Sequence, residues 1–111
     1  MPKETINIQD FQKLDLRVGT IISVERVEGT KKLYKVKVDL GDLGIKQTIS
    51  GLVGFYEPSE LMNRRVIFLS NLEGKKLAGL DSQGMLLAAE KDERLALVTI
   101  DRDVPNGATI S

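Results

Sequence analysis

Residues 57–62 read EPSELM, and the interpretation of the whole chain depends on this stretch. Pro58 stands where a helix can begin, because proline lacks the N–H that has no partner in the first turn of a helix. We therefore predict one short helical turn here. Segments with strand patterns lie on both sides of it, so its position in the series of strands is the informative feature.

Alternating apolar and polar residues predict most of these strands, and residues 66–69 form one that is apolar on both faces. The strand segments before the turn are residues 16–27, 33–40 and 45–49, and those after it are 66–69, 84–89 and 95–100. The expected apolar face of the first segment consists of Leu16, Val18, Ile22 and Val24. Gly19 within this segment predicts a bend or bulge at that point.

Three strands, a short helix and two further strands are the layout of an OB-fold, a five-stranded Greek-key barrel. Other small barrels fit the alternation alone, and the short helix favours the OB-fold. We predict an all-β, mainly β domain with short helices, of which the first is capped by Asn7. We expect residues 1–111 to form one domain, with 90–111 as a C-terminal strand extension.

The residue types that are missing exclude most kinds of catalysis. The chain has no cysteine and no histidine, which removes thiolate chemistry, the usual neutral-pH base and nearly all zinc sites. No phosphate-binding glycine motif occurs, and no two carboxylates have a spacing that suits acid–base work. We therefore predict a non-enzyme with no catalytic residues, no metal and no cofactor.

The polar start of the chain leads into no apolar segment, and no apolar run approaches the ~20 residues that span a bilayer. Together with the absence of cysteine, this predicts an intracellular, cytoplasmic protein with no membrane partner.

The charges are unevenly distributed although the formal net charge is zero. Residues 31–76 hold nine Lys and Arg against five Asp and Glu, whereas the remainder holds seven against eleven. Such a one-sided field attracts polyanions. The alternative is that these lysines only keep the strands soluble.

In an OB-fold, the loop between strands one and two and the loop between strands four and five flank the binding surface. The first loop carries Lys31 and Lys32, and the second carries Lys75 and Lys76. The outward side of residues 33–40 adds Lys35 and Lys37, with Arg64 and Arg65 as a rim. Because few aromatic residues are available for stacking, this face suits a folded RNA held by its backbone, 2′-hydroxyls and shape.

Neutral polar residues in the stretch 71–89 (NLEGKKLAGLDSQGMLLAA) could add hydrogen bonds. The candidates are Asn71, Ser82 and Gln83, and Met85 could touch a base. For the three polar residues, the alternative is a role in loop structure, as when Asn71 caps its own backbone. For Met85, the alternative is a place in the core.

Several motifs, in order, resemble those of the tRNA-binding domain family. They are residues 10–19 (DFQKLDLRVG), 32–34 (KLY), 38–41 (VDLG), 50–52 (SGL), 71–72 (NL) and 82–89 (SQGMLLAA). The family includes stand-alone tRNA-binding proteins, the C-terminal domain of methionyl-tRNA synthetases and a small secretion chaperone. Residues 27–29 depart from the His-Pro found there in many members.

The resemblance implies an OB-fold that recognises the outer corner of the L-shaped tRNA, as a free protein or as the dimerising C-terminal part of methionyl-tRNA synthetase. By motif position, the residues implicated in tRNA contact are Lys32, Asn71, Ser82 and Met85. A homodimer is also implied, with interface residues Phe11, Leu95, Leu97, Val98 and Val104. An aminoacyl-tRNA synthetase is a further implied partner, and a chaperone for unfolded polypeptides is the alternative function.

Overall fold

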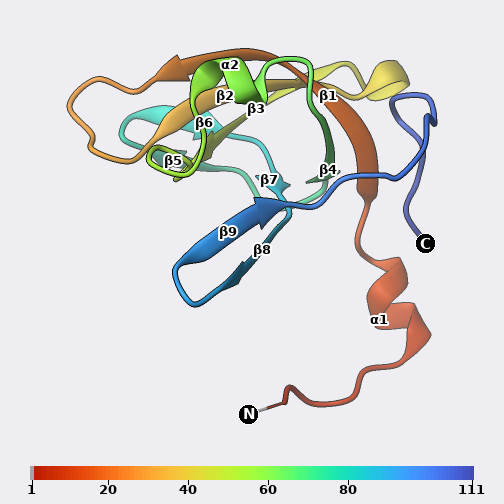
Figure 1. Ribbon diagram of the computed structural model, residues 1–111. Helices are drawn as coiled ribbons and strands as arrows, with labels where there is room; N and C mark the ends of the chain where they lie inside the picture. The colour runs from red at the N-terminus through yellow and green to blue at the C-terminus, as the bar shows by residue number, and fades with distance from the viewer. Residues whose placement is uncertain (1) are drawn as a thin grey trace.

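A sheet of five antiparallel strands forms the centre of the computed structural model, which describes residues 2–111 (Figure 1). The elements in chain order are α1 (Ile8–Gln12), β1 (Leu16–Arg26), β2 (Tyr34–Asp39), a 3-10 turn η1 (Gly41–Leu43), β3 (Ile45–Ser50), α2 (Pro58–Leu61), β4 (Arg65–Leu69), β5 (Lys75–Leu77), β6 (Leu80–Ser82), β7 (Met85–Leu86), β8 (Ala88–Lys91) and β9 (Arg94–Leu97). The order of strands in the central sheet is β3-β2-β1-β4-β7. This confirms the predicted mainly β fold with a short helix between the third and fourth barrel strands.

Strand β1 changes partners along its length and so curls the sheet into a barrel. Its first half pairs with β4, from Leu16 to Thr20, and its second half pairs with β2, from Thr20 to Arg26. At the opposite seam, the Gln83 N–H donates to the carbonyl of Gln47 in β3 at 2.8 Å. The barrel is therefore nearly closed.

The bulge in β1 lies at Ile22, and our expectations for this strand were wrong in two respects. The register with β2 shifts between Ile21 and Ser23, so Ile21 is fully buried while Ile22 is 37% exposed. An extra residue reverses the alternation beyond it, which a pattern of hydrophobicity cannot reveal. Gly19 pairs regularly, and a Cβ there would lie 2.5 Å from Cγ1 of Val38. Its glycine permits close packing rather than a bulge.

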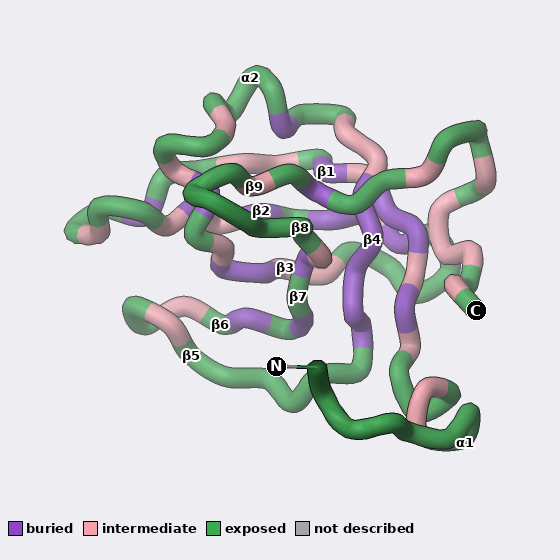
Figure 2. The backbone as a smooth tube through the Cα atoms, turned by 60° about the horizontal axis from the view of Figure 1, so that its bottom comes forward, coloured by how far each residue is buried: buried purple, intermediate pink, exposed green. Residues whose placement is uncertain are grey.

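Strand β4 is apolar on both faces, as predicted, because it separates two hydrophobic clusters. Val66 and Phe68 point into the barrel interior, whereas Ile67 and Leu69 join Leu16 and Val18 on the outside. The residues that cover this outer cluster are Phe11, Leu87, Ile100, Ala108 and Ile110. Figure 2 shows the buried backbone concentrated in β1, β2 and β4.

The two helices begin as their sequences predict. The side chain of Asn7 accepts a hydrogen bond from the Asp10 N–H at 2.9 Å. Helix α2 has Pro58 in its first turn and a capping box formed by Glu57 and Glu60. Among the described residues, neither helix is long and apolar enough to cross a membrane.

The C-terminal segment runs along the free edge of the first half of β1 (Figure 1). The Gly107 N–H donates to Val18, and the Ile110 N–H donates to Leu16. Arg65 in β4 donates to the side chain of Asp103 and to the carbonyl of Val104. The segment after β9 is therefore part of the domain's own packing.

The chain between β4 and β9 differs from the expected loop and long strands. Residues 75–82 form the hairpin β5–β6, whose turn residues Ala78 and Gly79 have φ values of 51° and 78°. Two consecutive positive φ values are typical of tight hairpin turns. The expected strand 84–89 is divided between the short β7 and β8, and β8 pairs with β9 in a separate hairpin.

Gly84 sits where no side chain fits, which yields a stability prediction. A Cβ at this position would lie 2.5 Å from the ring of Phe68 and would also clash with the carbonyl oxygen of Leu69. We expect Gly84→Ala to lower the free energy of unfolding by about 1–3 kcal/mol, because adding atoms to a filled core is destabilising. Urea denaturation measures this change. Gly74→Ala is the matched control, since its Cβ meets nothing closer than 3.7 Å. Equal stability of the two variants would contradict the packing described here.

Candidate nucleic-acid interface

The turn between β1 and β2 carries two exposed lysines, and hydrogen bonds hold its backbone in place. The Thr30 hydroxyl donates to the carbonyl of Val27 at 2.7 Å, closing the turn. The carbonyl of Lys32 accepts from the Val53 N–H at 3.2 Å. Lys31 and Lys32 are exposed and belong to no ion pair within residues 2–111.

The outward face of β1, β2 and β3 is mainly polar and carries two lysines of β2. The register places Lys35 opposite Glu25, and Lys37 between Ser23 and Gln47. The Lys35 ammonium lies 3.0 Å from a carboxylate oxygen of Glu25. The hydrogen bond from Lys35 lowers the pKa of Glu25, with further contributions from the charges of Lys35 and Lys37.

The pairing of Glu25 with Lys35 was not among our predictions, although the chain contains a signal for it. Glu25 and Lys35 lie at equal distances in sequence from residue 30, in the middle of the turn. In an antiparallel hairpin, residues equally distant from the turn face one another.

The β5–β6 hairpin carries the second pair of lysines and separates them. Successive strand residues point to opposite faces, so the two lysines point to opposite faces of the hairpin. In the register, Lys75 lies opposite Ser82 and Lys76 lies opposite Asp81. Both lysines are exposed, and together with Gly74 and Gln83 the hairpin residues line a hollow of about 300 Å³. Asp81 therefore offsets part of the positive charge of Lys76.

Ser82 and Gln83 connect this hairpin to β3. Ser82 is only 6% exposed, and its hydroxyl oxygen accepts from the Ile49 N–H and lies 3.2 Å from that of Thr48. The Thr48 hydroxyl in turn donates to the carbonyl of Gly84 at 2.9 Å. The side-chain oxygen of Gln83 accepts from the Gln47 N–H at 2.8 Å. Both candidates therefore make bonds that close the barrel.

Asn71 forms a similar internal bridge, whereas Met85 is open to solvent. The Asn71 side chain accepts from the Asp15 N–H at 2.8 Å and donates to the carbonyl of Lys13 at 2.6 Å. It thus fixes the end of β4 to the start of β1. Met85 is 46% exposed, at the exit of the β5–β6 hairpin.

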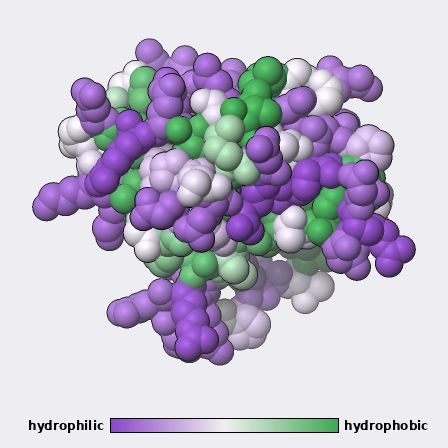
Figure 3. Space-filling model, turned by 45° about the horizontal axis from the view of Figure 1, so that its top comes forward, coloured by the Kyte–Doolittle hydropathy of each residue, from purple (hydrophilic) through white to green (hydrophobic). Residues whose placement is uncertain are grey.

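The two basic loops lie at the same end of the barrel in both Figures 1 and 2. Figure 3 shows a face covered mainly by hydrophilic side chains, with hydrophobic ones in small separate groups. Within residues 2–111, no three His, Cys, Asp or Glu side chains gather in a way that could hold a metal ion. The arrangement can bind a polyanion by its phosphates.

A family model described as a putative tRNA binding domain matches residues 16–109. The chain belongs to this family. It is 50% identical over 107 residues to a methionine–tRNA ligase of Methanococcus maripaludis, covering 96% of this chain and 16% of the ligase. The chain thus spans about a sixth of the curated relative that it matches.

Two solved structures resemble this member of the tRNA-binding domain family over the whole length of their chains. A MetRS related protein from Pyrococcus horikoshii superposes with a TM-score of 0.91 at 34% identity, covering 98% of this chain and all of that one. The chaperone CsaA from Bacillus anthracis superposes with a TM-score of 0.87 at 28% identity, covering 97% and 100%. Both OB-type barrels agree with the predicted fold.

The residues predicted for a dimer interface occupy different environments in this family member. Leu97 is 8% exposed and Leu95 is half-buried, and both pack with the barrel core. Phe11 is half-buried against the outer cluster, and Val104 is half-buried as well. Val98 is 39% exposed.

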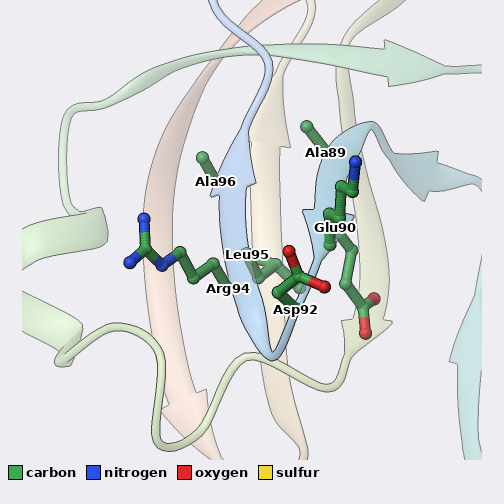
Figure 4. Close-up of a pocket in the computed structure, with 7 residues that line it drawn as sticks. Ala89, Glu90, Asp92, Arg94, Leu95 and Ala96 are labelled. Carbon is green, nitrogen blue, oxygen red and sulfur yellow. The ribbon is translucent and has the colours of Figure 1, made fainter.

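The β8–β9 hairpin has a charged, hollowed tip. Residues 89–92 and 94–96 line a hollow of about 610 Å³. In Figure 4, Arg94 extends to one side of the hairpin and Glu90 to the other, with Asp92 at the turn. Charges of both signs therefore lie along this projecting element.

The junction held by Asn71 also contains an ion pair that yields a pH prediction. Arg17 donates to both carboxylate oxygens of Asp15, and this hydrogen bond is the main reason that the pKa of Asp15 is lowered. A carboxyl group with a lower pKa in the folded state stabilises the fold above its unfolded pKa. That stability is lost as the pH falls through the folded pKa.

We expect Asp15→Asn to lower the free energy of unfolding at pH 7 by about 0.2–1 kcal/mol, because the pair is partly exposed. It should also flatten the dependence of that free energy on pH below about pH 4. Urea denaturation between pH 2 and pH 7 measures both. Asp42→Asn, which removes an exposed carboxylate, is the control, and an identical acid profile in the two variants would refute the assignment.

Proposed function

We propose that this chain is a non-catalytic module that binds tRNA by shape and backbone charge, at the outer corner of the L-shaped molecule. The observation that carries the proposal is the pair of basic loops flanking a polar sheet face, in a chain of the putative tRNA binding domain family. Phosphate contacts fix position without reading sequence. The module would therefore accept many tRNAs and raise their local concentration at an enzyme by tethering.

The contacts that we propose fall into two groups. The groups that reach the RNA directly are Lys31, Lys32, Lys75, Lys76 and Met85, whereas Lys35 lies on the same face with its ammonium 3.0 Å from a carboxylate oxygen of Glu25. Asn71, Ser82 and Gln83 hold the loops in place, because their polar atoms bond within the protein. Ser82 has too little exposed area for a large contact of its own.

The enzyme that we infer as partner is a methionyl-tRNA synthetase, either joined to this module or bound to it. The support is the 50% identity to a methionine–tRNA ligase and the likeness to a MetRS related protein. A module that serves such an enzyme acts in the cytoplasm.

Binding should be uniform across tRNAs and steeply dependent on salt. We expect similar affinities for several unrelated tRNAs, each weakening as salt rises because phosphate contacts release counterions. A gel-shift or filter-binding series at two salt concentrations measures this. Lys31→Glu/Lys32→Glu and Lys75→Glu/Lys76→Glu should each weaken binding at least about tenfold, from the loss of about two phosphate contacts.

The control variant is Lys3→Glu/Arg102→Glu, which changes the net charge by the same amount at exposed positions away from both loops. It should bind like the wild type. No binding by the wild type, or equal weakening by all three variants, would refute the proposed interface.

The alternative function is that of a chaperone for unfolded polypeptides, favoured by the likeness to the chaperone CsaA. Polypeptide binding needs a contiguous apolar surface. The charge-reversed variants distinguish the two functions, since they should lose tRNA and leave polypeptide binding intact. Wild type that binds a reduced, unfolded protein but no tRNA would establish the alternative.

We also propose that the module is a homodimer. The N-terminal segment leaves Ile6 and Ile8 62% and 61% exposed, and Leu14 45% exposed. This segment and the β8–β9 hairpin both extend from the lower side of the barrel in Figure 1. A two-fold interface uses the same patch on both copies, and these elements supply apolar side chains flanked by the charges of both signs at the hairpin tip.

Light scattering after gel filtration tests the dimer. We expect twice the chain mass of 12.3 kDa, and we expect Ile8→Asp to shift the mass toward one chain. Ile45→Asp is the matched control, because Ile45 is 58% exposed at the start of β3, outside the proposed interface. A monomeric wild type, or dissociation by Ile45→Asp alone, would contradict this interface.

A further inference from the structure

We propose that Glu25 forms an ion pair with Lys35 in the free protein and thereby limits how tightly the sheet face binds an RNA backbone. This inference rests on the tRNA binding proposed above. It assigns to an acidic residue on the binding face the role of a competitor for one phosphate contact. The same side chain therefore sets both the affinity of the module and its dependence on salt.

The pairing of the two side chains follows from the backbone. Glu25 in β1 and Lys35 in β2 are directly opposite in the ladder, and both project from the outward face. Their charged atoms are 3.0 Å apart. The closed β1–β2 turn keeps this register in place, so the carboxylate is held beside the lysine rather than meeting it by chance.

The exposures of the two side chains indicate competition rather than support. The Lys35 side chain is 26% exposed, so most of the side chain that carries the ammonium is already covered. The Glu25 side chain is 63% exposed, so the carboxylate stands where a phosphate would approach that ammonium. A phosphate must replace the carboxylate to bind Lys35, and it then lies next to an unpaired negative charge.

No other positive group in the sheet compensates for Glu25 fully. Lys37 is on the same face, and its charge acts on Glu25 more weakly than Lys35 does. The remaining neighbours in the register, Ser23, Gln47 and Ile49, are neutral. Two like charges about 5 Å apart in nearly water-like surroundings, with an effective dielectric constant of roughly 50–80, correspond to roughly a four- to tenfold change in an equilibrium constant.

The primary test is Glu25→Gln in the full chain, with a tRNA transcript as the probe. We expect binding to tighten about four- to tenfold, and the slope of log affinity against log salt to steepen by about 0.7–0.9. Glu28→Gln is the control. Glu28 is exposed in the same turn, carries the same charge and forms no ion pair within residues 2–111.

A double-mutant cycle with Lys35→Gln identifies the partner. Lys35→Gln alone should change the affinity less than about twofold, because Glu25 already neutralises Lys35 in the wild type. In the Glu25→Gln background, the same substitution should abolish the whole gain. This coupling separates a specific competitor from a general effect of net charge.

Several results would overturn the inference. Unchanged or weaker binding by Glu25→Gln would show that Glu25 does not compete, and equal tightening by Glu28→Gln would reduce the effect to net charge. A gain that survives in the double variant would exclude Lys35 as the partner. If the wild type binds no tRNA, the proposed function and this inference both fail. If the wild type binds and Glu25→Gln is no tighter, only the inference fails.

Discussion

The rest of the structure depends on the change of partner within β1 at Thr20. The first half of the strand pairs with β4 and the second half pairs with β2, so a single strand belongs to both walls of the barrel. The bulge at Ile22 and the absence of a side chain at Gly19 allow β1 to bend from one wall of the barrel to the other. As a result, one face of β4 lines the barrel while its other face needs a separate cover, which α1 and the C-terminal segment provide.

This geometry also determines the electrostatics of the candidate interface. Because β1 and β2 meet in a tight turn, their outward residues are held in a fixed register, and an acid and a lysine are opposed at 3.0 Å. The β5–β6 hairpin repeats the arrangement, with Asp81 opposite Lys76. A face that is basic in total is therefore divided into free lysines and lysines with an acid opposite them. The count of charges in a segment describes the long-range attraction, whereas the register decides which contacts are free to form.

Local patterns predicted the parts of the fold that local physics controls. Strict alternation in residues 33–40 gave the correct inward face of β2, and EPSELM gave α2 with its proline in the first turn. The failures have a common cause. The bulge at Ile22, the β5–β6 hairpin and the division of residues 84–89 are set by contacts between distant segments, such as the close approach of Gly84 to Phe68. The exposed lysines could be predicted because polar positions in alternating strands point outward. The burial of Ser82 could not, because its partner Thr48 lies in another strand.

The neutral polar residues of the stretch 71–89 make hydrogen bonds within the protein, so a motif can be required by the fold of the proposed interface as well as by a ligand. Asn71 uses both polar atoms on the backbone before β1, and Ser82 and Gln83 use theirs on β3. Ser82 is buried, and a buried polar group that loses its partner costs about 1–3 kcal/mol, so this position demands a particular side chain for structural reasons alone. The bonds of Asn71, Ser82 and Gln83 fasten both ends of the loop that carries Lys75 and Lys76. Each exposed lysine alone makes a weak and mobile contact. Several lysines can bind a rigid array of phosphates together only if the backbone segments that carry them do not move. The amides and hydroxyls therefore contribute to recognition by holding the charges at a fixed separation.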